Sequence, residues 1–253
     1  MNALSFELCV ESLEAARAAE AGGADRIELC AGLAHGGVTP DFNLVAATVK
    51  AVSIPVFVLI RPRPGSFHFS EEEYGLMCVQ VDAAKKAGAA GIAAGALQTD
   101  RRVDVTRSRK LVELAFPMKA TFHRAFDEAP NLAEALEDVI ATGADCLLTS
   151  GGKSDVLAGV ESIACVREWA GNRLDVMAGG GLRLENLGEV VRRTGVTLLH
   201  SSLMRRNGGC CAENRPDGTP SCNTVLLEAD VRDAIRLFHE EFKAREALRL
   251  QTG

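Results

Sequence analysis

Residues 22–30, Gly22-Gly23-Ala24-Asp25-Arg26-Ile27-Glu28-Leu29-Cys30, join the end of a helix to a short apolar strand. Glycine at such a junction can take the left-handed conformation that ends a helix. The same kind of junction recurs at Gly88-Ala89-Ala90, Gly143-Ala144-Asp145 and Gly195-Val196-Thr197. The recurrence predicts repeated turns from helix to strand at one end of a parallel sheet.

Short apolar runs alternate with amphipathic runs along most of the chain. Strands are expected at 5–9, 26–30, 55–61, 91–94, 119–124, 146–149, 175–178 and 197–201. Helices are expected between them, for example at 12–21, 70–87, 132–142 and 184–194. Runs of about five residues rich in Val, Ile, Leu and Phe are typical of buried parallel strands. Eight strand–helix units in 253 residues predict a closed (β/α)8 barrel, the TIM barrel of the α/β class.

One domain, residues 1–253, accounts for the whole pattern. The exception to the alternation is 205–223, a polar stretch with several glycines and prolines, which we expect to be a long loop. A helix at 225–248 would then close the barrel. Cys210, Cys211 and Cys222 lie in the loop, either as thiols without a set role or as ligands on a flexible arm.

Composition and charge limit the classes of partner. The net charge of −6 argues against a nucleic-acid or membrane-surface partner, because both favour a basic face. The first residues lack the basic and apolar regions of a signal peptide. Several of the eight cysteines lie inside apolar segments, as reduced thiols do. We therefore expect a cytoplasmic protein.

Strand parity places polar side chains inside the barrel. Residues i and i+2 of a strand share a face, so Glu7 and Cys9 point one way while the apolar residues between them point the other. Glu28 and Cys30 repeat this arrangement, and the bulky apolar set should face the helices. The later strands add further residues to the same interior: Phe57, Leu59, Arg61, Thr121, His123 and His200.

These carboxylates have two interpretations. A buried carboxylate is costly unless it is paired, and Arg61 and Arg124 are the expected partners of Glu7 and Glu28. The groups then either form a structural ion-pair network or serve a site. Barrel interiors are normally filled by Val, Ile and Leu, which favours a site at the mouth.

The thiols of Cys9 and Cys30 also have two interpretations. Each could be a small buried apolar residue. Neighbouring parallel strands lie about 4.8 Å apart, so in-register side chains would bring the sulfurs within roughly 4–6 Å. Two such thiolates could hold a soft monovalent ion such as Cu(I). Zinc would need four ligands in a structural site, and the pair lacks a CxxC spacing.

Glycine-rich turns and arginines suggest an anion site at the same mouth. Ser150 begins the turn after the sixth strand, and Gly179, Gly180 and Gly181 follow the seventh. Backbone amides in such turns can bind an anion, although tight turns alone would also explain the glycines. The side chains expected to add to this site are Arg61, Arg63, Arg124 and His200.

Long motifs in the chain resemble the CutC family. They include residues 7–12, 22–30, 36–40, 60–63, 121–127, 148–152 and 179–181, and the resemblance extends from about 5 to 202. It implies a (β/α)8 barrel, a cytoplasmic location and homo-oligomers, dimers or tetramers. It also implies a role in copper homeostasis with Cu(I) at Cys9 and Cys30.

Two functions therefore remain open. The first is Cu(I) binding at Cys9 and Cys30. The alternative is an enzyme acting on a small anionic or phosphorylated metabolite. In that enzyme Glu7, Glu28 or His123 would move protons while the arginines and the glycine turn hold the anion.

Overall fold

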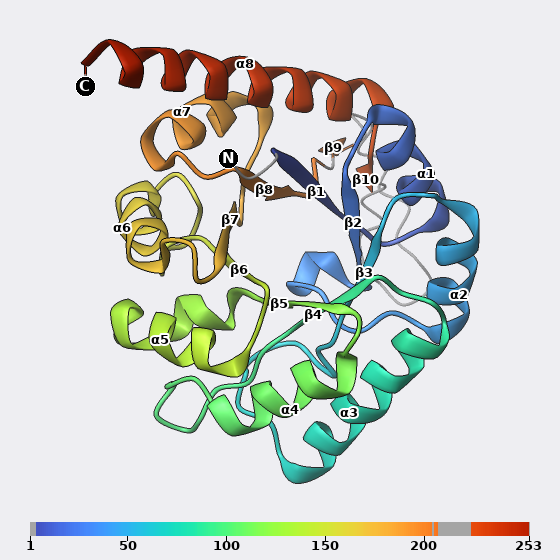
Figure 1. Ribbon diagram of the computed structural model, residues 1–253. Helices are drawn as coiled ribbons and strands as arrows, with labels where there is room; N and C mark the ends of the chain where they lie inside the picture. Colours follow the sequence, from blue (N-terminus) through green and yellow to red (C-terminus); the bar gives the residue numbers. More distant parts are fainter. Residues whose placement is uncertain (1–3, 204, 207–223, 253) are drawn as a thin grey trace.

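Eight parallel strands close into one barrel in the computed structural model, which describes residues 4–203, 205–206 and 224–252 (Figure 1). Each strand pairs with the next along the chain, and the eighth pairs with the first. The strands are β1 (Ser5–Val10), β2 (Arg26–Leu29), β3 (Val56–Leu59), β4 (Gly91–Ala94), β5 (Lys119–Phe122), β6 (Cys146–Thr149), β7 (Asp175–Gly179) and β8 (Leu198–Ser201). The expected (β/α)8 barrel is confirmed.

A ring of helices surrounds the barrel (Figure 1). They are α1 (Leu13–Gly22), α2 (Phe42–Ala51), α3 (Glu71–Lys86), α4 (Val105–Ala115), α5 (Leu132–Thr142), α6 (Val160–Ala170), α7 (Leu184–Thr194) and α8 (Glu228–Thr252). Two short 3-10 helices, η1 (Leu33–His35) and η2 (Arg124–Glu128), follow β2 and β5 at the mouth. No helix in the described residues is long and apolar enough to cross a membrane.

The helix-to-strand turns have the predicted left-handed glycines. Gly23 and Gly143 have φ of 94° and 82°, a region in which a side chain would strain the backbone. The aspartates of the same motifs add a contact across the sheet. Asp25 accepts a hydrogen bond from the Phe6 amide at 2.7 Å, and Asp145 accepts one from the Ala120 amide at 2.9 Å. Each aspartate thus ties its turn to the start of the preceding strand.

Alternate residues of the strands divide between two cores. The outward-facing side chains pack in one large cluster with the helices: they include Phe6, Leu8, Val10, Ile27 and Leu29. The inward-facing side chains form two smaller clusters inside the barrel: Cys9, Cys30, Leu59 and Ala93 in one, and Cys146, Leu148, Met177 and Leu198 in the other. The predicted parity of the first two strands is therefore confirmed.

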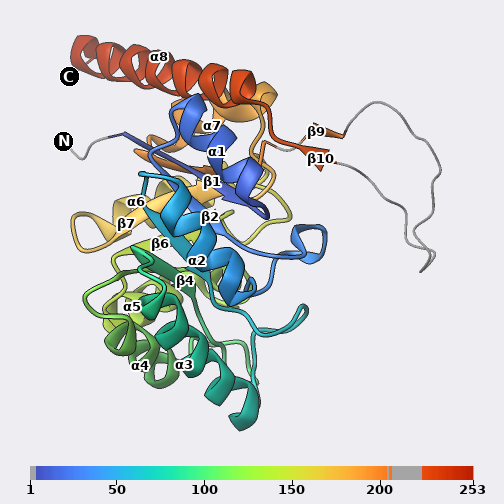
Figure 2. The same ribbon diagram turned by 90° about the vertical axis from the view of Figure 1, so that its right-hand side faces the viewer.

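The C-terminal part begins with a short antiparallel pair outside the barrel. β9 (Arg205–Arg206) pairs with β10 (Thr224–Val225), and the pair extends from the barrel beside the mouth (Figure 2). α8 starts at Glu228, three residues after the expected start at 225, because Val225 belongs to the ladder. Cys210, Cys211 and Cys222, and most of the expected loop at 205–223, lie outside the described residues.

Candidate functional site

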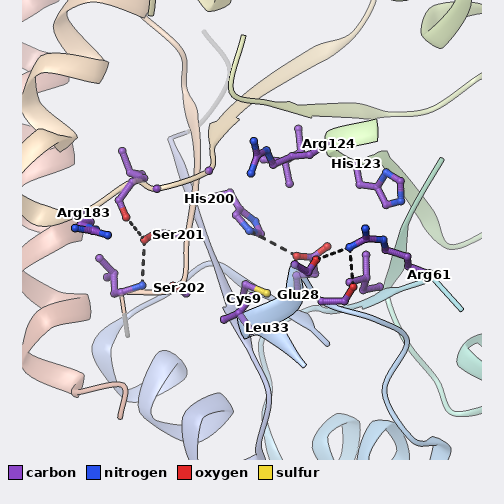
Figure 3. A pocket seen from close by; sticks show the side chains of 18 of the residues that line it. Cys9, Glu28, Leu33, Arg61, His123, Arg124, Arg183, His200, Ser201 and Ser202 are labelled. Atoms are coloured by element: carbon purple, nitrogen blue, oxygen red, sulfur yellow. Dashed lines mark hydrogen bonds and ion pairs between the residues drawn. The ribbon is translucent and has the colours of Figure 1, made fainter. Parts of the chain in front are cut away.

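A cavity of about 1030 Å³ opens at the carboxyl ends of the strands. This is the end of a TIM barrel at which active sites form. Its described lining carries charged, imidazole and thiol groups from the ends of five strands, β1, β2, β3, β5 and β8: Cys9, Glu28, Arg61, His123, Arg124 and His200. Figure 3 shows these side chains pointing into one space.

The two Glu-Leu-Cys segments are staggered by two residues. Cys9 is level with Glu28, while Glu7 is level with Arg26 on one side and with His200 on the other. Strands of a closed barrel must shift in this way because they tilt against its axis. The in-register arrangement expected for the two cysteines is therefore wrong. Their sulfurs are nevertheless 3.3 Å apart, closer than expected, because Cys30 reaches Cys9 diagonally across the stagger.

Arg26 is the charge partner of Glu7. Its Nε lies 2.5 Å from Glu7 Oε2, and the Glu7 side chain is only 3% exposed. The other Glu7 oxygen lies 2.7 Å from Nδ1 of His200. Burial raises the pKa of Glu7, but Arg26 and His200 outweigh it and hold the pKa below its usual value.

The predicted partners, Arg61 and Arg124, do not pair with the two glutamates. Arg61 instead donates to the carbonyls of Gly36, Gly37 and Gly65. Arg124 donates to Asp127 and to Ser150. Arg61 and Arg124 lie just after the last residues of β3 and β5, at the mouth of the barrel. Arg26 is the first residue of β2 and is level with Glu7, so its side chain can reach the Glu7 carboxylate.

Glu28 and His200 face each other at the floor of the cavity. Nε2 of His200 lies 3.6 Å from Oε2 of Glu28. Burial, with the nearby Glu7 carboxylate, raises the pKa of Glu28 despite the opposing effect of His200. Burial lowers the pKa of His200, but the hydrogen bond to Glu7 and the Glu28 charge raise it by more. Each group thus favours the protonated state more than it would in water.

The Cys9 thiol lies at the floor of the cavity, with the Cys30 thiol next to it. Cys9 lines the cavity, whereas Cys30 is fully buried behind it and is not among the described lining residues. The contact with Cys30, burial and the Glu28 carboxylate all raise the pKa of Cys9 well above its usual value. A metal that binds here must therefore displace a proton.

His123 is a neutral hydrogen-bond donor. Burial and the Arg61 charge lower the pKa of His123 to about 3. Its Nδ1 accepts a hydrogen bond from the Ala125 amide at 3.3 Å, so Nε2 carries the proton. This buried Nε2 has no hydrogen-bond partner within the part of the chain that the structure describes, and neither does Nε of Arg61. The Arg61 guanidinium and the His123 ring both lie against the Phe67 ring.

Two residues expected in the anion site lie elsewhere. Arg63 turns to Glu73, with Nε 2.5 Å from Oε1, and does not belong to the described lining. Ser150 is fully buried, and its hydroxyl contacts Asp127, Arg124 and the Lys153 carbonyl.

The turn after β6 already holds a carboxylate of the chain itself. Asp127, on η2, accepts hydrogen bonds from the amides of Ser150 and Gly152 and from the hydroxyl of Thr149. The Arg124 side chain adds an ion pair at 2.9 Å. The amides expected to bind an external anion at this turn are therefore occupied.

The turn after β7 faces the cavity instead. Gly179 ends β7, and Gly180 and Gly181 belong to the lining with Arg183. Gly180 has φ of 99°, and a Cβ atom there would lie 2.8 Å from Cζ of Arg124. Glycine thus lets the Arg124 guanidinium lie directly against the backbone of this turn.

Sequence reasoning missed Arg26 and Arg183. The signal for Arg26 was present, because it lies two residues before Glu28 and so shares its inward face. Arg183 directly follows the glycine turn and Leu182, which places it at the mouth.

Comparison with known proteins shows the family to which the chain is related. The sequence profile of the CutC family matches residues 4–205. The chain belongs to the CutC family. A family protein CutC from Vibrio cholerae is 36% identical over 235 residues, covering 91% of this chain and 92% of the relative. A human relative, named copper homeostasis protein cutC homolog, is 42% identical over 201 residues and covers 79% of this chain and 74% of the relative.

Solved structures place the CutC barrel among other TIM barrels. The crystal structure of CutC from Streptococcus agalactiae is 27% identical, with a TM-score of 0.75, covering 79% of this chain and 98% of that one. Phosphoribosylanthranilate isomerase from Pyrococcus furiosus has a TM-score of 0.54 at 15% identity, covering 94% of this chain and 99% of that one. This second likeness concerns the fold alone.

Proposed function

We propose that this CutC-family chain binds Cu(I) through Cys9 and Cys30 and serves copper homeostasis. The observation that carries the proposal is the 3.3 Å separation of the two sulfurs inside the barrel. The name of the human relative supports the same role. Cu(I) prefers soft thiolate ligands, and two of them suffice for a monovalent ion.

The surroundings of the two thiols fit a soft ion. Leu59, Ala93 and Leu33 pack around them and limit the access of water. The open face of Cys9 gives the ion a route from the cavity. When bound, Cu(I) would replace the protons of both thiols and leave a single negative charge, and the His200 ring nitrogen lies within 4.8 Å of the Cys9 sulfur, where a protonated imidazole would offset it.

Removing either thiol is expected to abolish tight Cu(I) binding at this site. The test is an anaerobic Cu(I) titration against a competing chelator, in a background in which Cys210, Cys211 and Cys222 are Ser. We expect Cys9→Ser and Cys30→Ser each to lose the tight equivalent that the background protein binds. Cys165→Ser, at an exposed free thiol, is the control and should bind like the background. Unchanged affinity in both barrel variants would refute the proposal.

The proposal retains a cytoplasmic location and assembly into dimers or tetramers. Cys9, Cys30, Cys78, Cys146 and Cys165 are all free thiols, which suits a reducing compartment. Leu76 and Val79, three residues apart on α3, are 47% and 64% exposed, which favours contact with a second copy.

A second candidate function is an enzyme acting on a small anionic or phosphorylated metabolite. The observation that favours it is the pair of buried donors, Arg61 Nε and His123 Nε2, beside a cavity far larger than one metal ion needs. In this proposal they hold substrate oxygens together with Arg124 and the turn at Gly180 and Gly181. Glu28, opposite His200, is the best candidate for proton transfer, and Glu7 orients the imidazole.

Phosphorylated and carboxylated metabolites are expected to raise the melting temperature of the protein. A ligand at 100 times its Kd stabilises a fold by about 2.7 kcal/mol, a shift of about 5–10 °C for a chain of this size. Arg61→Gln should abolish the shift. Arg63→Gln, on the same loop but directed at Glu73, should retain it. If no anion shifts the melting temperature of the parent protein, the enzyme proposal fails.

A further inference from the structure

Three chemically different ligand atoms meet at the floor of the cavity. The Cys9 sulfur, a Glu28 carboxylate oxygen and a His200 ring nitrogen all lie within 4.8 Å of one another. They come from the neighbouring strands β1, β2 and β8, and Cys9 is level with Glu28 because of the barrel stagger. Figure 3 shows the three side chains directed at the same space.

Their spacing fits a single tetrahedral ion. Nε2 of His200 lies 3.6 Å from Oε2 of Glu28. Two nitrogen or oxygen ligands held about 2.1 Å from one tetrahedral ion lie roughly 3.4 Å apart. A small rotation of the side chains therefore brings the pair into coordination distance, without movement of the barrel backbone.

The imidazole of His200 is already oriented for a metal. Its Nδ1 lies 2.7 Å from Glu7 Oε1, and Glu7 is in turn held by Arg26 at 2.5 Å. Histidines that bind metal through one nitrogen commonly donate the other N–H to a carboxylate, which sets the tautomer and the ring orientation. Glu7 and Arg26 thus leave Nε2 as the nitrogen that faces Glu28 and the cavity.

One side of the group formed by Cys9, Glu28 and His200 faces the cavity. Cys9, Glu28 and His200 all line the cavity, whereas Cys30 is fully buried behind Cys9. Structural zinc sites have four protein ligands, while catalytic sites have three and keep one position for water or substrate. Three ligands at the base of a cavity of about 1030 Å³ correspond to the second arrangement.

We propose that Cys9, Glu28 and His200 bind a divalent transition-metal ion of the zinc class, with one coordination position open to the cavity. A thiolate and a carboxylate neutralise the charge of the dication, and the neutral imidazole completes the set. The open position would take an oxygen of water or of a small anionic ligand held by the arginines of the mouth. This site shares Cys9 with the proposed Cu(I) pair but not Cys30, and it does not depend on Cu(I) binding.

Titration with Co²⁺ tests the site through its absorption spectrum. In the background in which Cys210, Cys211 and Cys222 are Ser, one equivalent should give a thiolate-to-metal charge-transfer band and the intense visible bands of a tetrahedral ion. Added Zn²⁺ should displace the bound Co²⁺ and remove these bands. We expect Cys9→Ser to remove the charge-transfer band, and Glu28→Gln and His200→Gln each to weaken binding by about 100-fold or more. Circular dichroism of each variant checks that the barrel is folded.

Three further variants make the result specific. Glu185→Gln changes another carboxylate of the lining and should bind Co²⁺ like the background protein. Glu7→Gln should weaken binding by about 10–100-fold while keeping the tetrahedral spectrum, because Glu7 orients a ligand without being one. Cys30→Ser should keep Co²⁺ binding although it loses Cu(I), which separates this proposal from the copper proposal.

Three results would overturn the inference. They are the absence of a stoichiometric Co²⁺ or Zn²⁺ site in the background protein, full binding by both Glu28→Gln and His200→Gln, and loss of binding in Cys30→Ser. The last result would mean a closed site with both cysteines as ligands, without a position for substrate.

Discussion

Replacing Arg26 with Met is expected to lower the free energy of unfolding by about 3–5 kcal/mol, because the change leaves the Glu7 carboxylate buried without its cation. The Arg26 side chain is 16% exposed and that of Glu7 is 3% exposed, so water cannot replace the lost partner. Met keeps most of the volume of the arginine stem beside Phe57, whose ring lies 4.4 Å from the guanidinium carbon. His200 still contacts Glu7, which favours the lower end of the range.

The matched control is Arg173→Met. Arg173 forms a bidentate pair with Glu137, but their side chains are 49% and 59% exposed. Exposed pairs of this kind contribute up to about 1 kcal/mol. Urea denaturation of both variants measures the difference. A similar loss of stability in the two variants would mean that Arg26 does not compensate a buried charge.

Replacing Asp127 with Asn is expected to lower the free energy of unfolding by about 2–4 kcal/mol, because the carboxylate accepts hydrogen bonds on both oxygens. One oxygen accepts from Thr149 and Gly152, the other accepts from Arg124, and Ser150 donates to both. An amide offers only one accepting atom. Whichever way it is turned, its NH₂ group faces donors that lose their partner.

Asp41→Asn is the control for this prediction, since it makes the same chemical change at an exposed helix N-cap. Asp41 accepts a hydrogen bond from the Asn43 amide at 2.8 Å, and Asn caps helices about as well as Asp. We expect little change there in thermal or urea unfolding. If Asp127→Asn lowers the free energy of unfolding no more than Asp41→Asn does, the turn after β6 does not depend on the buried carboxylate.

The hydrogen bonds of Asp127 also limit where an external anion can bind at the mouth of the barrel. Because the chain supplies its own carboxylate at the turn after β6, we expect the anion of the proposed enzyme at the turn after β7 and the nearby arginines. Arg124 connects the two turns, since it pairs with Asp127 and lies against Gly180. Loss of the Asp127 carboxylate is therefore expected to change the position of the Arg124 guanidinium as well as to destabilise the fold.

The two metal proposals differ in which neighbour of Cys9 they use. Cu(I) would take the buried sulfur of Cys30, and a zinc-class ion would take the oxygen and nitrogen ligands on the cavity side. Soft Cu(I) prefers sulfur ligands, whereas a borderline ion such as Zn²⁺ also accepts nitrogen and oxygen ligands. The reciprocal effects expected for Cys30→Ser and Glu28→Gln therefore decide which ion the site serves.

The sequence by itself determined the features that depend on neighbours along the chain. Strand parity correctly placed Glu7 and Cys9 inside and Phe6 and Leu8 outside, because side chains alternate along a strand. The glycines at helix ends were equally legible, since Gly23 adopts its left-handed conformation for local steric reasons. Eight such units sufficed to predict the closed barrel.

Only the tertiary structure decided which of these inward groups meet. Barrel closure shifts each strand against the next, and this stagger sets Glu7 level with Arg26 and Cys9 level with Glu28. The pairing of Glu7 with Arg26, the His200 orientation and the ligand group of Cys9 and Glu28 follow from that shift. The sequence of a single strand does not encode the shift, because it arises from hydrogen bonds between separate strands and from the closure of the barrel between β8 and β1.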